Sequence, residues 1–252
     1  MFNINKNITL NQLEKNIQEI LYKKIDCMPE DFNHEMKLAL ELFQKRVFLE
    51  KTIDETISFN KQFIWENKNK NLSLATTAED LLNVFKLRSN IYGNLNYQDE
   101  FPDFINGLNF DNYDFTSAII LYKSNGVISG TTRIIVDSEN KLPIEDKFSL
   151  DNYRGVNKTI AELSRLIVSN ENKGLNLEFK YLMQGIYQLY SQNDLDLLFL
   201  VIVKEHYKLY SKFGGSEIIK EFDDYGNLGH GTMILSWDPN KVSKFFEKAF
   251  LK

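Results

Sequence analysis

Apolar positions along the chain recur with two different periods, and the change divides the sequence in two. In segments 13–21 and 36–64 the apolar residues are spaced three or four apart, which is typical of amphipathic helices. All 12 glycines lie at or beyond Gly93. This contrast predicts a helical N-terminal extension over residues 1–72 and a second domain over residues 73–252.

The second region alternates between helical and strand-like patterns. Asn125-Gly126 lies between two apolar runs and favours a tight hairpin turn, because both residues tolerate positive φ. Strands are predicted over residues 72–75, 116–122, 127–136, 159–168, 194–203, 217–222 and 232–237, the run 194–203 being apolar enough for a central strand. Helices are predicted over residues 77–92, 175–190 and 204–212 and near the C-terminus. This order indicates an α+β fold.

Composition narrows the class of protein without pointing to an activity. The 252 residues are 43% hydrophobic with a net charge of -5, which excludes a disordered chain and gives no general attraction to nucleic acid or anionic membranes. Cys27 is the only cysteine, so an intramolecular disulfide is excluded. We expect a cytoplasmic protein, because the sequence shows neither a signal-peptide pattern nor an apolar run long enough for a transmembrane segment.

Arginine is scarce, and its positions are informative. Only five of the 30 basic residues are arginine. The planar guanidinium binds carboxylates through two parallel hydrogen bonds, which lysine cannot reproduce. The arginines that lie on predicted elements with acidic residues nearby are Arg88, Arg133 and Arg165, and the acidic residues are Asp111, Asp114 and Glu162. On a regular strand Glu162 and Arg165 point to opposite faces, so they share a site only if a bulge intervenes.

The order of these motifs resembles one group of enzymes. Leu87-Arg88…Tyr92, Asp111…Asp114, Gly130…Arg133, Leu142…Phe148 and Glu162-Leu-Ser-Arg165 follow the order found in acyl-homoserine-lactone synthases and in their relatives, the long-chain N-acyl amino acid synthases. The resemblance covers roughly residues 73–240. It implies the GNAT acyltransferase fold, in which helices flank a central mixed, mostly antiparallel sheet.

The resemblance also implies a reaction. An N-acyltransferase of this type moves a fatty acyl chain from the phosphopantetheine thioester of an acyl carrier protein, or from CoA, to the α-amine of a small acceptor. The acceptor is an amino acid, or S-adenosylmethionine in the lactone synthases, which make quorum-sensing autoinducers. Neither a permanently bound cofactor nor a metal is implied.

Roles for individual residues follow from the same resemblance. Glu162 corresponds to the general base, directly or through water. The substrate-binding positions are Arg88, Tyr92, Asp111, Asp114, Arg133, Phe148 and Arg165, with the aspartates fixing the arginines. Backbone amides near Ile167 and Val168 correspond to the oxyanion and pantetheine contacts, and the helix start at Lys173 and Gly174 to the phosphate contact.

Two departures favour an amino acid as the acceptor. The tryptophan that the lactone synthases carry after the arginine is replaced by the stretch Asn96-Tyr97-Gln98, and the segment from His206 to Gly214 resembles the amino acid synthases. A lactone synthase, an acetyl-CoA-dependent GNAT enzyme and a non-catalytic ligand-binding relative stay open as alternatives. Lys204, Lys208 and Lys212 recur every four residues and suggest either a docking face for an acidic carrier protein or a solvated helix face.

Overall fold

The computed structural model describes residues 9, 11–12, 15–16, 32–155, 158–169, 177–224, 226 and 229–252. By internal packing the chain forms two compact units, Met1–Thr52 and Ile53–Lys252. The helical pattern expected over segment 36–64 is confirmed as α2 (Phe32–Asn60), whereas most of segment 13–21 lies outside the described residues. The assignment of residues 1–72 to a separate extension stays a prediction.

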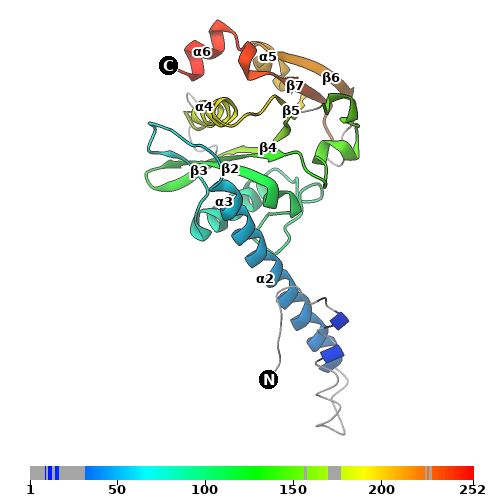
Figure 1. The fold of residues 1–252 in the computed structure, drawn as a ribbon. Helices are drawn as coiled ribbons and strands as arrows, with labels where there is room; N and C mark the ends of the chain where they lie inside the picture. The colour runs from blue at the N-terminus through cyan, green and yellow to red at the C-terminus, as the bar shows by residue number, and fades with distance from the viewer. Residues whose placement is uncertain are drawn as a thin grey trace. The chain divides into compact units, whose positions relative to one another are not determined.

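The second unit is built on one seven-stranded sheet with the order β1-β2-β3-β4-β5-β7-β6 (Figure 1). Only β4 and β5 pair in parallel, and all other neighbours are antiparallel. The strands are β1 (Leu72–Leu74), β2 (Ser117–Ser124), β3 (Val127–Val136), β4 (Ile160–Val168), β5 (Leu197–Val203), β6 (Ser216–Phe222) and β7 (Thr232–Trp237). The predicted mixed, mostly antiparallel sheet is confirmed, and β5 is an interior strand as its apolar sequence indicates.

Local sequence signals explain where several elements begin. Thr77 accepts a hydrogen bond from the Asp80 amide at 3.1 Å and caps the first turn of α3, as its position predicts. Asn125 and Gly126 both take positive φ, 52° and 82°, in the turn between β2 and β3. The α-helices are α3 (Ala78–Asn94), α4 (Leu177–Gln192), α5 (Tyr207–Tyr210) and α6 (Lys244–Phe250). The 3-10 helices are η1 (Asn112–Thr116), η2 (Pro143–Asp146), η3 (Asp151–Tyr153), η4 (Lys204–His206) and η5 (Pro239–Lys241).

Helix α4 covers one face of the sheet and forms the larger core. Its buried residues pack with those of β1, β2 and β5, including Leu72, Ile120 and Leu198. Gly185 permits a close approach, because a Cβ atom there would lie 3.1 Å from side-chain atoms of both Leu72 and Ile120. A bulkier residue at this position would push the helix away from the sheet.

The opposite face carries α3 and a second apolar cluster. Ile135 of β3 and Phe199 of β5 pack there with Ile144 and Leu150, which come from the connection between β3 and β4. All four side chains are fully buried. This cluster matters for function because Glu162 of β4 pairs with both Ile135 and Phe199 and therefore shares their face.

One predicted helix is wrong in its length. Segment 204–212 was expected as a single helix, but it forms the 3-10 turn η4 followed by the single turn α5. Phe213 is buried against Trp237 and Phe246, and its carbonyl accepts from the Ser243 amide at 2.7 Å, so the chain must turn early to enter β6. The three lysines therefore do not lie on one regular helix: Lys204 lies in η4, where it pairs with Asp223 at 3.1 Å, Lys208 lies in α5, and Lys212 follows α5. Docking of a carrier protein at these lysines stays a prediction.

The parallel pair β4–β5 separates partway along its length. Pairing runs from Ile160 opposite Leu197 to Leu163 opposite Leu200, whereas β4 stays paired with β3 as far as Val168. The second half of β4 therefore has an open edge toward β5. Within the described ranges, none of the helices combines the length and apolar character needed to cross a membrane.

Candidate active site

The site begins with Arg88, which α3 holds in the interior. Arg88 follows Phe85 by three residues on the buried face of the helix, and the whole side chain is buried. Its Nη1 donates to both carboxylate oxygens of Asp114, at 2.9 and 3.1 Å. Burial lowers the pKa of the Arg88 guanidinium, and the Asp114 carboxylate opposes that shift. An arginine remains charged under these conditions, so the two residues form a buried ion pair.

The two aspartates are fixed by the backbone of η1. Asp111 Oδ1 accepts from the Tyr113 amide at 2.9 Å, and Asp114 Oδ2 accepts from the Asp111 amide at 3.0 Å. This reciprocal arrangement is a capping box built from two aspartates. The backbone of η1 therefore helps to fix the positions of both carboxylates.

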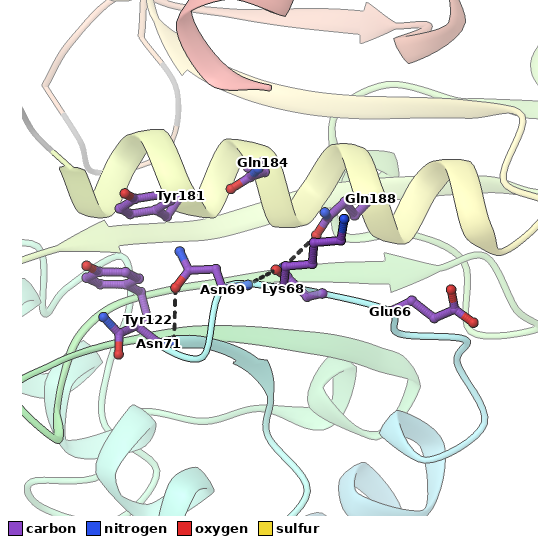
Figure 2. A pocket seen from close by; sticks show the side chains of 9 residues that line it. Glu66, Lys68, Asn69, Asn71, Tyr122, Tyr181, Gln184 and Gln188 are labelled. Carbon is purple, nitrogen blue, oxygen red and sulfur yellow. Dashed lines mark hydrogen bonds between the residues drawn. The ribbon is translucent and has the colours of Figure 1, made fainter. Parts of the chain in front are cut away.

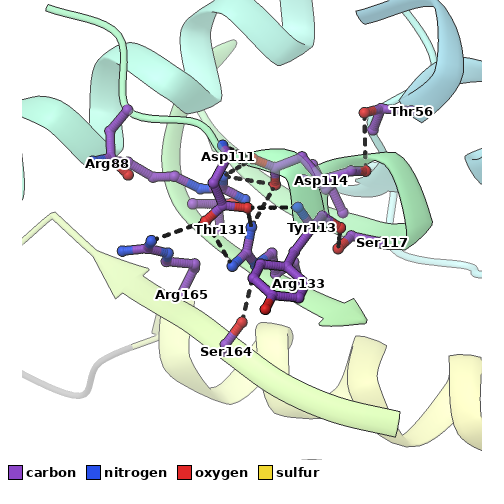
Figure 3. A network of polar contacts seen from close by, with 12 residues as sticks. Thr56, Arg88, Asp111, Tyr113, Asp114, Ser117, Thr131, Arg133, Ser164 and Arg165 are labelled. Carbon is purple, nitrogen blue, oxygen red and sulfur yellow. Dashed lines mark hydrogen bonds and ion pairs between the residues drawn. The ribbon is translucent and has the colours of Figure 1, made fainter. Parts of the chain in front are cut away.

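Arg133 of β3 joins the two carboxylates, as Figure 3 shows. Its Nη1 donates to Asp111 Oδ1 at 2.6 Å and to Asp114 Oδ1 at 3.0 Å, and its Nη2 donates to Asp111 Oδ2 at 3.0 Å. Its Nε donates to Ser164 Oγ at 3.0 Å. Burial alone would raise the pKa of Asp111, but the charge and hydrogen bonds of Arg133 outweigh it and lower that pKa. The predicted pairing of arginines with aspartates is thus what the structure contains.

A bulge in β4 brings Arg165 to the same side. Thr131 pairs with Ile167 and Arg133 pairs with Ser164, so Arg165 and Leu166 together oppose one residue of β3. Arg165 has a φ of 54°, unusual for a residue other than glycine. Its Nη2 donates to Asp111 Oδ2 at 3.1 Å. This is the bulge that the sequence required if Glu162 and Arg165 were to share a site.

Aromatic rings hold the Arg165 guanidinium in place. Its Cζ lies 4.3 Å from the ring centre of Phe101 and 5.2 Å from that of Tyr92. Arg165 and Asp111 are also the members of the network that reach solvent, with 13% and 30% of their side chains exposed, whereas Arg88 and Asp114 are fully enclosed. The network therefore has a buried part, formed by Arg88 and Asp114, and an accessible edge, formed by Arg165 and Asp111.

Glu162 lies in the apolar cluster on this face. It is 5% exposed, and its Oε2 accepts from the Ile144 amide at 2.8 Å. Burial raises the pKa of Glu162 to about 7; the Ile144 hydrogen bond and the charges of Arg133 and Arg165 lower it, and Asp111 raises it. A carboxyl with this pKa accepts and releases a proton near neutral pH, as a general base or acid must.

The remaining predicted positions fall in three places. Phe148 is half-buried and packs against the cluster around Glu162. Ile167 and Val168 lie on the half of β4 that has left β5. The Ser169 amide donates to Ser129 at 2.8 Å, and donors alternate along an antiparallel strand, so the Val168 amide points away from β3 toward the open edge. Lys173 and Gly174 lie outside the described residues.

Sequence reasoning assigned no role to four groups that the structure shows in or behind the site. Ser164 accepts from Arg133; its alternation with Glu162 along β4 places both on one face, but nothing in the sequence marks it as a partner of an arginine. Thr56 and Asn60 of α2 donate to the carbonyls of Asp114 and Ser117, each at 3.0 Å, although no motif marks them. The Ile144 amide is a backbone group and leaves no signature in the sequence.

A separate polar cavity of about 550 Å³ lies on the α4 side of the sheet, between segment 66–71 and the helix (Figure 2). Tyr122 and Tyr181 stack at one end, with ring centres 5.3 Å apart. None of the predicted site residues that the structure describes lines it. Among the residues that the structure describes, the histidines, cysteines and carboxylates form no cluster that could hold a metal ion.

A family comparison agrees with the geometry of the site. The family model of the N-acyl amino acid synthase FeeM matches residues 83–238, which is more than half of the chain. The chain belongs to the FeeM family of N-acyl amino acid synthases. The matched residues include Arg88, both aspartates, Arg133 and Glu162. No curated protein sequence matches the chain.

Solved structures show the fold that this FeeM family member shares. FeeM from uncultured soil microbes is 16% identical, with a TM-score of 0.52 over 71% of this chain and 94% of that one. The acyl-homoserine-lactone synthase LasI is 17% identical, with a TM-score of 0.57 over 71% and 93%. BjaI, a CoA-dependent lactone synthase solved with SAM and isopentyl-CoA, is 14% identical, with a TM-score of 0.52 over 68% and 81%. The protein is an N-acyltransferase with a GNAT-like fold.

Proposed function

We propose that the protein transfers a fatty acyl chain from a thioester to the α-amine of an amino acid, with Glu162 as the general base. The observation that supports this most directly is the state of Glu162, a buried carboxyl with a pKa of about 7 beside an ordered arginine–aspartate network. An α-ammonium group must lose its proton before the nitrogen can attack. A base poised near neutral pH suits that task.

The reaction balances with the groups at hand. Glu162 first passes one proton of the ammonium group to solvent, which leaves a neutral amine and a free carboxylate. The amine nitrogen then attacks the thioester carbonyl carbon, and the new C–N bond forms as Glu162 takes a second proton from nitrogen. The C–S bond then breaks, the electron pair stays on sulfur, and Glu162 returns the proton to the thiolate. The products are an N-acyl amino acid and a free thiol, and Glu162 ends in its starting state.

The accessible edge of the network suits the acceptor's carboxylate. Arg165 lies over the ring of Phe101, donates to Asp111 through one nitrogen and is partly exposed, which makes it the guanidinium best placed for a ligand. Its Nη1 is buried and has no hydrogen-bond partner among the described residues, and a bound carboxylate would satisfy this donor. We assign Arg88 and Arg133 to holding Asp111 and Asp114, and Tyr92 and Phe148 to the walls of the substrate pocket.

The open edge of β4 suits the acyl donor. The Val168 amide points into the gap where β5 has separated, and a backbone donor there can bind the thioester oxyanion or a pantetheine amide. We place the donor's phosphate near Lys173 and Gly174. The phosphopantetheine of an acyl carrier protein is our first choice of donor. CoA is the second, because BjaI is a CoA-dependent synthase.

Mass spectrometry of lipid extracts from cells expressing the protein tests this function. We expect an N-acyl amino acid to accumulate with the wild type and to fall by roughly 10²-fold or more with Glu162→Gln. An acyl-homoserine lactone would instead identify S-adenosylmethionine as the acceptor, and an N-acetyl product would identify an acetyl-CoA enzyme.

A non-catalytic binding protein makes a different prediction. Its Glu162→Gln variant would retain ligand binding, and neither protein would yield an acylated amine. If the wild type produced none even when acyl carrier protein, CoA thioesters and amino acids were all supplied, the proposed function would be wrong.

A further inference from the structure

Arg154 is the one arginine of the second unit that the arginine–aspartate network does not involve. It follows η3, in the connection between β3 and β4. Its Nε and Nη2 donate to the two carboxylate oxygens of Asp137 at 2.7 and 2.8 Å. Its Nη1 donates to Glu145 Oε1 at 2.8 Å, and its Nη2 also binds Glu145 Oε2. The guanidinium thus joins the residue that follows β3 to a residue of η2.

Arg154 with its two carboxylate partners, Asp137 and Glu145, is called the clasp below. Glu145 connects the clasp to the backbone through two hydrogen bonds. Its Oε2 accepts from the Leu142 amide at 3.1 Å, and its Oε1 accepts from the Leu150 amide at 3.4 Å. One carboxylate therefore closes segment 142–150 at both ends. The hydrogen bonds from Arg154 lower the pKa of Glu145 to about 2, so the clasp stays charged across the physiological range.

The segment closed in this way covers Glu162. Ile144 lies in its middle and donates the backbone hydrogen bond to Glu162 Oε2 at 2.8 Å. Leu142, Ile144 and Leu150 are at most 1% exposed and belong to the apolar cluster on that face. Both the position of the Glu162 carboxyl and its separation from water depend on this segment.

We propose that Arg154 is a positioning residue for Glu162. Through Asp137 and Glu145 it holds segment 142–150 closed, which keeps the Ile144 amide on the carboxyl and keeps water away from it. This role rests on the proposed function of Glu162 as the base. Lysine cannot replace Arg154, because one ammonium group cannot bind two carboxylates in a bidentate manner at the same time.

The test compares Arg154→Met and Arg154→Lys with the wild type in the pH dependence of kcat and kcat/KM. Loosening the segment admits water to Glu162, which lowers its pKa, and weakens the Ile144 hydrogen bond, which raises it. The first effect outweighs the second, because burial is the largest cause acting on this pKa. We expect the acidic limb of the profile to move to lower pH by about one unit or more in both variants. We also expect kcat to fall by roughly tenfold, because a weaker base removes the proton less well.

The direction of the shift distinguishes this role from a direct effect of charge. Removing a positive charge would raise the pKa of a carboxylate nearby, so a long-range electrostatic role predicts a limb moved to higher pH in Arg154→Met and unmoved in Arg154→Lys. A purely structural clasp predicts lower stability with an unchanged profile. Either result would overturn the proposal.

Arg46→Met is the matched control. Arg46 also pairs with a glutamate, Glu50, at 3.0 Å, but it lies on the exposed surface of α2. We expect its kinetic profile to equal that of the wild type. If both Arg154 variants fail to fold, Asp137→Asn removes one half of the clasp and must shift the limb in the same direction.

A measurement without turnover separates this inference from the proposed function. The ¹³C resonance of the Glu162 carboxyl, assigned by its loss in Glu162→Gln, reports the pKa whether or not the enzyme is active. A lower pKa in Arg154→Met than in the wild type supports the positioning role even if no acyl transfer is found. An unchanged pKa contradicts it even if the wild type is fully active.

Discussion

Burial of the Glu162 carboxyl suits it to catalysis but lowers the stability of the folded protein. A buried carboxyl with a raised pKa is useful as a base near pH 7, but its burial penalises the charged form. The folded state holds the proton up to about pH 7, whereas the unfolded chain releases it near pH 4.3. The free energy of unfolding therefore falls as the pH rises through this window.

Glu162→Gln should remove this pH-dependent fall in the free energy of unfolding, because the amide stays neutral and its oxygen still accepts from the Ile144 amide. At pH 8 we expect the variant to be more stable than the wild type by roughly 3 kcal/mol, and at pH 4 the two should be equal. Urea unfolding at both pH values measures the difference. The exposed Glu139→Gln should match the wild type throughout, and a Glu162→Gln difference that does not change with pH would contradict the account.

Arg133 is the residue on which the carboxylate network depends most. Arg133→Met leaves Asp111 without its two-point partner and Asp114 with Arg88 as its remaining arginine. Breaking a buried pair in this way costs about 3–5 kcal/mol. Lys123→Met is the control, because it breaks the more exposed pair with Asp80, which is worth under about 1 kcal/mol. Equal losses in urea unfolding would show that the network is not structural.

At the scale of elements, the last turn of α2 supports the start of β2. The Asn60 side chain donates to the Ser117 carbonyl at 3.0 Å and accepts from the Ile119 amide at 2.9 Å. Ser117 directly follows η1, whose capping box fixes Asp111 and Asp114. A helix that precedes the family match thus stabilises the element that presents the carboxylates.

Asn60→Ala tests that support. It leaves a buried carbonyl and a buried amide without a partner, which should cost about 2–4 kcal/mol. Amide hydrogen exchange at Ile119 should accelerate more than exchange at the centre of β3. The exposed Asn140→Ala should change the free energy of unfolding by no more than about 0.5 kcal/mol and should leave exchange at Ile119 unchanged. Unchanged exchange at Ile119 in Asn60→Ala would contradict the proposed role of Asn60.

Elements set by local sequence signals could be predicted from the sequence, whereas elements shaped by distant contacts could not. Thr77 and the Asn125-Gly126 pair act within a few residues, so α3 and the β2–β3 hairpin were predicted correctly. Segment 204–212 has a helical pattern, but the burial of Phe213 and the return into β6 shorten it to single turns. The sequence could say only that a bulge is needed if Glu162 and Arg165 share a site. Whether the bulge exists depends on how β4 pairs with β3.

At the scale of the whole molecule, the site was predictable in its members and not in its geometry. Composition showed that arginine was rare, and the resemblance supplied which carboxylates to consider. The sheet order then decides that Arg133 meets both aspartates while Glu162 lies among apolar residues with one backbone donor. Arg154 shows the limit: its position in the sequence gave no role, because the segment that it closes is defined only in three dimensions.

The most direct test of the account is turnover by the purified protein, with acyl carrier protein thioesters and acyl-CoA offered separately against a mixture of amino acids. Product mass identifies the acyl chain and the acceptor together. We predict an N-acyl amino acid whose rate of formation rises with pH to a plateau above about pH 7 and falls by roughly 10²-fold or more in Glu162→Gln. Equal rates for the wild type and Glu162→Gln would contradict the role of Glu162 at the centre of this account.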